Sequence, residues 1–85
     1  MRVTIPSPLL SYTRRREVSA AGSTLDEVTR DLDRQFPGLR FRMVDEQDCL
    51  RPHMRAFLDG DEVRDMGAVL DVARTLHFVQ ALSGG

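Results

Sequence analysis

The residues with the clearest chemical potential are the last ones of the sequence, Ala81-Leu82-Ser83-Gly84-Gly85. A terminal carboxylate has a pKa of about 3.3–3.7, so at neutral pH it is ionised and a poor electrophile. It can acylate another group only after activation, for example as an acyl-adenylate. Glycine has no Cβ and accepts most backbone conformations, so Gly84 and Gly85 would form a thin tether that fits a partner's active site. The alternative is a frayed chain end, since glycine and disorder concentrate at termini.

The basic side chains of the sequence limit which groups could react with an activated Gly85. All twelve are arginine, because the chain contains no lysine. If Gly85 were activated, no side-chain amine of the protein could capture it, and only the N-terminal amine could. The net charge is −1, which does not indicate nucleic acid or an anionic membrane as a partner.

Cys49 is the only cysteine, which rules out an internal disulfide and favours a reducing compartment. It lies in a predicted turn, so we expect a bystander thiol. The first residues, Met1–Pro6, lack the apolar run of a signal peptide. No stretch has membrane-spanning length. We therefore expect a cytoplasmic protein.

Histidines and a group of acidic residues are weaker candidates for a site. His53 and His77 each lie on or beside a predicted strand, without a second ligand at metal spacing, so structural or surface roles are expected. Asp59, Asp61 and Glu62 surround a predicted hairpin, which is usually a solvated turn. The sequence predicts no metal site and no cofactor bound by this chain.

A chain of 85 residues predicts one domain with a modest core. Arg2–Ile5 alternates polar and apolar residues and predicts a strand, which Pro6 and Pro8 end. A loop is expected through Tyr12. Arg15–Ala20 alternates weakly and predicts a second strand, paired with the first as a hairpin.

A helix is predicted from Leu25 to Phe36. Thr24 and Glu27 have the spacing of a capping box at its start, and Pro37-Gly38 ends it. Its apolar residues follow at spacings of three, four and four and form one stripe, comprising Leu25, Val28, Leu32 and Phe36.

The second half of the chain is predicted to form strands. Leu39–Val44 alternates, as a strand would, and Met54–Leu58 is predicted to be the next strand. Asp59-Gly60 is a tight-turn dipeptide from which Glu62–Arg64 returns. Leu76–Val79 is the final strand, and it runs almost directly into the terminal glycines.

This order predicts an α+β fold over residues 1–80, in which a mixed four- to five-stranded sheet packs on one main helix. The first and last strands would lie side by side and parallel at the centre, joined by the long path between them. That arrangement is the ubiquitin-like β-grasp. Residues 81–85 would form a flexible C-terminal tail projecting from one end of the sheet.

Phe57 is a candidate docking residue. On strict alternation Met54, Ala56 and Leu58 share one face of their strand, so Phe57 faces the other side, beside Arg55. An outward phenylalanine on a small sheet can mark a patch where a partner binds. It could equally pack under the Pro6–Tyr12 loop.

Nearly the whole chain resembles the MoaD/ThiS family of ubiquitin-like sulfur carriers. The resemblance is carried by several segments in a fixed order, namely Ile5–Thr13, Gly22–Leu25, Phe36–Arg40, Leu50–Arg64 and Val79–Gly85. The chain departs from the family at Gln80, where many members have proline. Gln80 leaves the last strand free to donate one more backbone hydrogen bond.

The resemblance implies a specific chemistry. A partner similar to ubiquitin-activating enzymes, using its own ATP and magnesium, would adenylate the Gly85 carboxylate, and a sulfur donor would convert it to a thiocarboxylate. Gly84 would provide clearance, and Ala81, Leu82 and Ser83 would be held by the partner through main-chain hydrogen bonds. The carrier would be a co-substrate rather than an enzyme, a monomer when free, and would pass sulfur to an acceptor enzyme or synthase.

Two questions stay open at this stage. Molybdopterin, thiamine, cysteine and thio-natural-product pathways all use such carriers, so the acceptor is not identified. The alternative function is a ubiquitin-like modifier, whose activated Gly85 would be joined to lysines of target proteins. Both functions begin with the same adenylation and differ in whether sulfur or an amine attacks.

Overall fold

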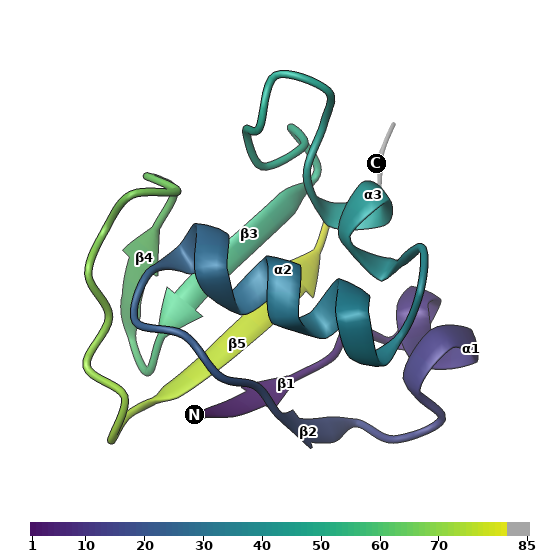
Figure 1. Cartoon of the computed structure of the whole chain (residues 1–85), viewed down its shortest axis with the longest axis horizontal. Helices are drawn as coiled ribbons and strands as arrows, with labels where there is room; N and C mark the ends of the chain where they lie inside the picture. The colour runs from purple at the N-terminus through teal and green to yellow at the C-terminus, as the bar shows by residue number, and fades with distance from the viewer. Residues whose placement is uncertain (82–85) are drawn as a thin grey trace.

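The computed structural model describes residues 1–81 (Figure 1). Its five strands are β1 (Arg2–Thr4), β2 (Glu17–Ser19), β3 (Met54–Leu58), β4 (Asp61–Val63) and β5 (Thr75–Gln80). The helices are the 3-10 turn η1 (Ser7–Leu9) and the α-helices α1 (Leu10–Thr13), α2 (Leu25–Gln35) and α3 (Leu39–Met43).

The strands form one mixed sheet in the order β2-β1-β5-β3-β4. β1 and β5 are parallel and central, with Val3 opposite Leu76, and the other neighbours are antiparallel. The parallel central pair and the five-stranded sheet confirm the predicted ubiquitin-like β-grasp. β5 is the middle strand and pairs with β1 on one side and with β3 on the other, so the chain leaves the sheet from its centre.

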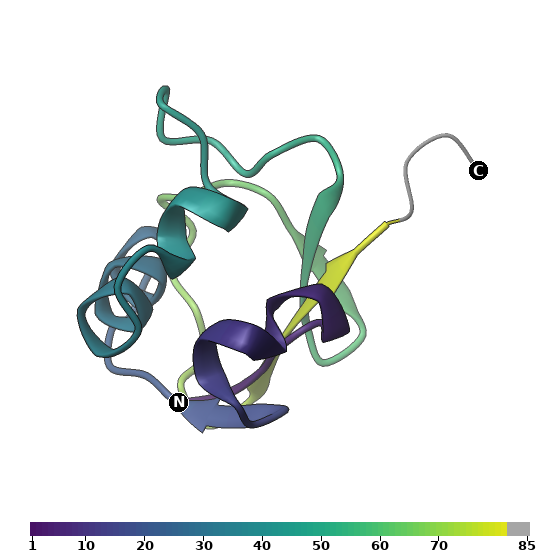
Figure 2. The same ribbon diagram turned by 90° about the vertical axis from the view of Figure 1, so that its right-hand side faces the viewer.

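The core lies between the sheet and α2, which crosses one face of the sheet (Figures 1 and 2). Leu25, Val28 and Leu32 are fully buried and Phe36 is partly buried, which confirms the predicted stripe. At the start of α2 the Thr24 hydroxyl accepts a hydrogen bond from the Glu27 N–H at 3.2 Å. The Glu27 carboxylate accepts one from the N–H of Ser23 rather than of Thr24, so the reciprocal half of the capping box is displaced by one residue.

The predicted strand over Leu39–Val44 is wrong, because Leu39–Met43 forms α3. A strand would bury Leu39, Phe41 and Met43 together, but Phe41 is 59% exposed while the other two are fully buried. Leu39 and Met43 are four residues apart, the spacing of one helix face. Gly38 turns the chain into α3 with φ of +93°, and the Asp33 carboxylate accepts a hydrogen bond from its N–H at 3.0 Å.

The predicted loop between Pro6 and Tyr12 is also corrected, since most of it is helical. Pro8 lies in the first turn of η1, where its missing N–H is tolerated, and α1 follows directly. Leu9 is buried and Tyr12 packs against the core, so this segment closes one end of the β-grasp core.

The β3–β4 hairpin has the predicted two-residue turn, Asp59-Gly60, with Leu58 opposite Asp61. The Arg74 guanidinium donates to Asp59 and Asp61 at 2.9 Å each and to the Leu58 carbonyl at 2.8 Å. Arg74 therefore fixes the hairpin to the start of β5. Within residues 1–81 no helix is both long and apolar enough to cross a membrane.

Candidate functional site

The site of interest is the end of β5, where the chain leaves the sheet. The Ala81 N–H donates to the His53 carbonyl at 2.8 Å, just beyond the last β3–β5 pair, Met54 and Gln80. Ala81 is exposed and is the last residue that the structure describes. A partner that used the Ala81 N–H, as the resemblance implies, would have to displace it from His53.

The remaining predicted site residues, Leu82, Ser83, Gly84 and Gly85, lie outside the described residues. Their roles therefore stay predictions. What the structure does show is the surface that surrounds the base of this segment, on both sides of Gln80.

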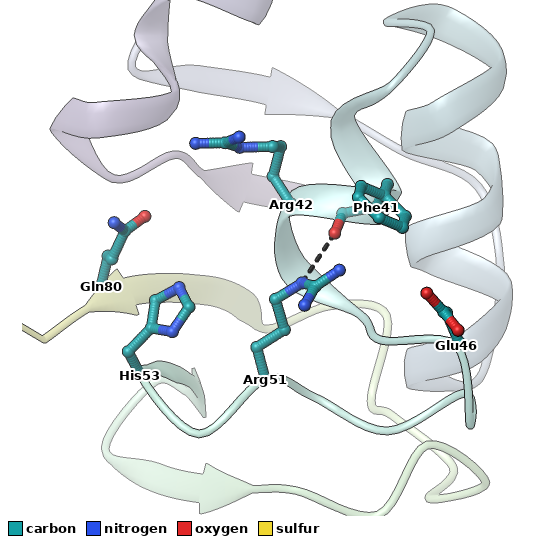
Figure 3. A pocket seen from close by; sticks show the side chains of 6 residues that line it. All are labelled: Phe41, Arg42, Glu46, Arg51, His53 and Gln80. Atoms are coloured by element: carbon teal, nitrogen blue, oxygen red, sulfur yellow. Dashed lines mark hydrogen bonds between the residues drawn. The ribbon is translucent and has the colours of Figure 1, made fainter.

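On one side of Gln80 is a shallow pocket of about 330 Å³ between α3, the loop that precedes β3 and the end of β5 (Figure 3). Its lining side chains are Phe41, Arg42, Glu46, Arg51, His53 and Gln80. Arg51 is held in place, because its Nε donates to the Phe41 carbonyl at 2.8 Å and its guanidinium lies 4.7 Å from the centre of the Phe41 ring. Figure 3 shows Arg42 directed into the hollow, across from His53.

On the other side of Gln80 is a wider and mainly apolar groove of about 770 Å³. It runs between the Thr4–Pro8 segment, Arg16 and the His77–Gln80 part of β5. On the sheet the Thr4 hydroxyl and His77 Nδ1 are hydrogen-bonded at 2.9 Å. Val79 is 45% exposed, which places an apolar side chain directly before the chain leaves the sheet.

The pocket and the groove on the two sides of Gln80 are both lined by arginines. Arg16 and Arg42 are exposed, and no salt bridge within residues 1–81 involves Arg16, Arg42 or Arg51. Arg16 contacts the Ser7 hydroxyl at 3.3 Å, and Arg51 lines the pocket that reaches Gln80. The base of the tail therefore lies between arginines whose charge is available to a partner.

Phe57 lies on the outer face of the sheet, as the alternation predicted. Met54, Ala56 and Leu58 are buried toward the helix, whereas Phe57 is half-buried opposite Glu62 and His77. β5 separates Phe57 from β1 and the segment that follows it. Leu9 and Tyr12 of the Pro6–Tyr12 segment pack against the core instead. The role of Phe57 in docking remains a prediction.

The acidic residues of the hairpin are neutralised by arginines. The hydrogen bond from Arg74 holds the pKa of Asp59 below its usual value, and Asp61 contacts the same guanidinium. Glu62 lies 3.6 Å from Arg55. Over residues 1–81 no group of three or more His, Cys, Asp or Glu side chains is arranged to bind a metal.

Cys49 and His53 are placed as the sequence suggested. Cys49 is exposed in the turn before β3, with its Sγ 3.6 Å from the Gln47 carbonyl. His53 is half-buried, and its carbonyl accepts the hydrogen bond from the Ala81 N–H.

The groove beside β5 was not predicted from the sequence. Its signal is Pro6, which cannot donate a backbone hydrogen bond where β1 would otherwise continue.

Comparison with solved structures gives full-length matches, although no protein-family model and no curated protein sequence matches the chain. A chain of the BexX/CysO complex of Amycolatopsis orientalis has 27% identity and a TM-score of 0.90, over 99% of this chain and 98% of that chain. Mycobacterium tuberculosis CysO has 24% identity and a TM-score of 0.86, over 95% and 98%. Small archaeal modifier protein 1 of Methanosarcina acetivorans has 17% identity and a TM-score of 0.83, over 99% and 94%.

These neighbours are ubiquitin-like β-grasp proteins of the MoaD/ThiS carrier and modifier type, so the predicted resemblance is confirmed. One of them is named as a small archaeal modifier protein. The similarity spans the whole described fold, including the strand that leads into the candidate site.

Proposed function

We propose, on the premise that this chain has the fold of the ubiquitin-like carriers and modifiers, that it is a sulfur carrier protein. The observation that carries the proposal is the full-length match to a chain of the BexX/CysO complex at 27% identity. The arrangement of β5 supports it, because this strand is paired with β1 as far as His77 and with β3 as far as Gln80, so the sheet holds the residues that lead into the tail. The reactive group in this proposal is the Gly85 carboxylate.

The first chemical step takes place on a partner enzyme that supplies ATP and magnesium. A Gly85 carboxylate oxygen attacks the α-phosphorus of ATP and pyrophosphate leaves, which converts a poor electrophile into an acyl-adenylate. The absence of Cβ atoms at Gly84 and Gly85 lets the tail pass through a narrow channel to reach the nucleotide.

The second step replaces the nucleotide with sulfur. Hydrosulfide attacks the acyl carbon, AMP leaves, and the sulfur loses its proton to give the terminal thiocarboxylate. A persulfide donor first forms an acyl disulfide. A thiol then attacks the donor's sulfur, forms a disulfide with it, loses its proton and releases the same thiocarboxylate. An acceptor enzyme or synthase then takes the sulfur, and this chain acts as its co-substrate.

The proposal includes a transient complex with a partner, as in the solved BexX/CysO complex. The groove and the pocket on the two sides of Gln80 are the surfaces closest to the base of the tail, so the partner would contact them first. The biosynthetic pathway is not part of the proposal.

The test is mass spectrometry of the protein recovered with its native activating machinery. Intact mass first establishes that Gly85 is the C-terminal residue of the recovered protein. Trypsin then cuts after Arg74 and releases Thr75–Gly85, which contains neither Met nor Cys, so exchange of oxygen for sulfur cannot be confused with side-chain oxidation. We expect sulfur on Gly85.

Two other outcomes would overturn the proposal. Thr75–Gly85 joined to lysines of other proteins would establish the modifier function instead. An unmodified carboxylate, despite ATP, a sulfur donor and a competent activating enzyme, would contradict both functions.

A variant pair separates chemistry from folding. Gly84→Val is expected to block thiocarboxylate formation by filling the clearance that glycine provides, while thermal stability stays unchanged. Gly60→Ala is the matched control, because a Cβ at Gly60 would meet nothing within 4 Å. Equal thiocarboxylate yields from the two variants would contradict the clearance role of Gly84.

A further inference from the structure

The edge of β5 that faces β1 is open over its last residues. Pairing of β1 with β5 ends at Thr4 and His77, whereas β5 continues to Gln80. Pro6 follows in the β1 chain and has no N–H to offer. Its carbonyl is also taken, because it accepts the Leu9 N–H at 2.9 Å at the start of η1.

The alternation of backbone groups along β5 shows which of them face this open edge. The Ala81 N–H donates to His53, and the Thr75 carbonyl accepts from Asp59 at 2.9 Å, so the odd-numbered residues bond toward β3. Successive backbone groups point to opposite sides of a strand. The N–H and C=O of Gln80 therefore point away from β3, and within residues 1–81 no acceptor outside the sheet takes the Gln80 N–H.

The apolar groove lies along this open edge. Pro6, Pro8 and Val79 line it, and Arg16 stands at its rim without a carboxylate partner within residues 1–81. Free backbone groups beside side-chain pockets are the two components of recognition by strand addition. The guanidinium at the rim adds a preference for negative charge.

We propose that an extended segment of a partner protein binds as an added strand beside Phe78–Gln80. It places apolar side chains in the groove along Pro6 and Pro8 and a carboxylate against Arg16. This inference deepens the proposed function, since the partner segment would lie beside Gln80, the last residue of β5 before the predicted tail. The backbone of β5 would then be held on both sides, by β3 and by the partner.

The experiment is a titration of the full-length 15N-labelled protein, followed by amide chemical shifts. The probe is the peptide acetyl-Glu-Val-Thr-Val-Glu-amide, and the comparison peptide has lysine in place of both glutamates. We expect the acidic peptide to bind at millimolar concentration and to shift the amides of Ser7, Arg16 and Phe78–Gln80. The lysine peptide is expected to bind more weakly.

A pair of variants at one position isolates the backbone donor. Gln80→Pro removes the N–H that faces the groove without removing a bond to β3, and Gln80→Ala keeps it. We expect Gln80→Pro to weaken binding about fivefold, as the loss of one backbone hydrogen bond implies, and Gln80→Ala to bind like the parent. Arg16→Glu is expected to weaken binding of the acidic peptide about threefold.

The proposal is overturned if the shifts map to another surface, or if Gln80→Pro binds as well as Gln80→Ala while its spectrum shows an intact fold. Equal binding of the two peptides would remove the role of Arg16. The titration needs no activation of Gly85, so its failure alongside a detected thiocarboxylate would overturn strand addition alone. Peptide binding without any thiocarboxylate would overturn the sulfur carrier alone.

Discussion

At the scale of single residues, Gly22 shows why one position admits only glycine. Its φ is +131°, and a Cβ built there would lie 2.8 Å from the Glu27 Cβ and 2.9 Å from the Val28 nitrogen. Both contacts are with the first turns of α2, where the chain passes from β2 into the helix. Glycine is thus required for conformation and for space at the same position.

Gly22→Ala is therefore expected to lower the free energy of unfolding by about 2 kcal/mol. Urea denaturation measures this change, and the m-values of the variant and the parent are compared to check that they are the same. Gly60→Ala, at an open position, should stay within about 0.5 kcal/mol of the parent. Equal stability of the two variants would contradict the close approach at Gly22.

Arg74 and Asp59 give a pH dependence with a definite sign. The Arg74 hydrogen bond lowers the pKa of Asp59 in the folded protein, while the unfolded chain keeps a value of about 3.9. Between the two pKa values the unfolded state binds more protons, so stability rises with pH. The contribution is complete above the unfolded pKa and is lost as pH falls through the folded pKa.

Arg74→Gln should accordingly lower the melting temperature at pH 7, and the difference from the parent should shrink below about pH 4. Thermal unfolding followed by circular dichroism across this acid range measures both effects. Asp59→Asn should show the same reduced dependence on pH. A constant difference at all pH values would show that the pair is not responsible.

At the scale of elements, α3 depends on Arg40 for its position against α2. The Arg40 guanidinium donates to the Thr29 hydroxyl at 3.1 Å and to Asp26 at 2.8 Å, both on α2, and to Asp48 at 3.3 Å. Its side chain is only 16% exposed. A helix of five residues is too short to be stable alone, so tertiary contacts of this kind hold it.

Arg40→Gln should lower the free energy of unfolding by about 1–2 kcal/mol, the range for a charged hydrogen bond. It should also speed amide hydrogen exchange in α3 more than in α2. Arg34→Gln is the control, because Arg34 is 77% exposed and, among residues 1–81, pairs only with Asp31 on its own helix. Similar exchange rates in α3 for the two variants would contradict the anchoring role of Arg40.

At the scale of the whole molecule, one core connects α2 with both halves of the sheet. Leu32 is fully buried in it, whereas Val69 is 81% exposed. Domains of this size have net stabilities of about 5–15 kcal/mol, so the loss of one large core side chain removes a substantial part.

Leu32→Ala is expected to destabilise the protein by about 3 kcal/mol, through lost burial and the cavity left behind. Val69→Ala should change stability by no more than about 0.5 kcal/mol. Chemical denaturation of both variants measures the difference. A small effect at Leu32 would mean that the core repacks around the gap.

The sequence by itself determined the parts that rest on local pattern. The stripe of α2 and the Asp59-Gly60 turn follow from residue spacing, and the order of the predicted elements led to the β-grasp. The resemblance to sulfur carriers rests instead on whole segments of the sequence, such as Leu50–Arg64 and Val79–Gly85. The proposed reactive group, Gly85, also comes from the sequence alone.

Only the tertiary structure decided what depends on burial and on partners distant in sequence. Leu39–Met43 has apolar residues at both strand and helix spacing, and the exposure of Phe41 separates the two. The helical turns after Pro6 and the role of Arg74 depend on contacts that no short window contains. The open edge at Gln80 exists because two segments 70 residues or more apart stop pairing at Thr4 and His77, which only the register of the folded sheet reveals.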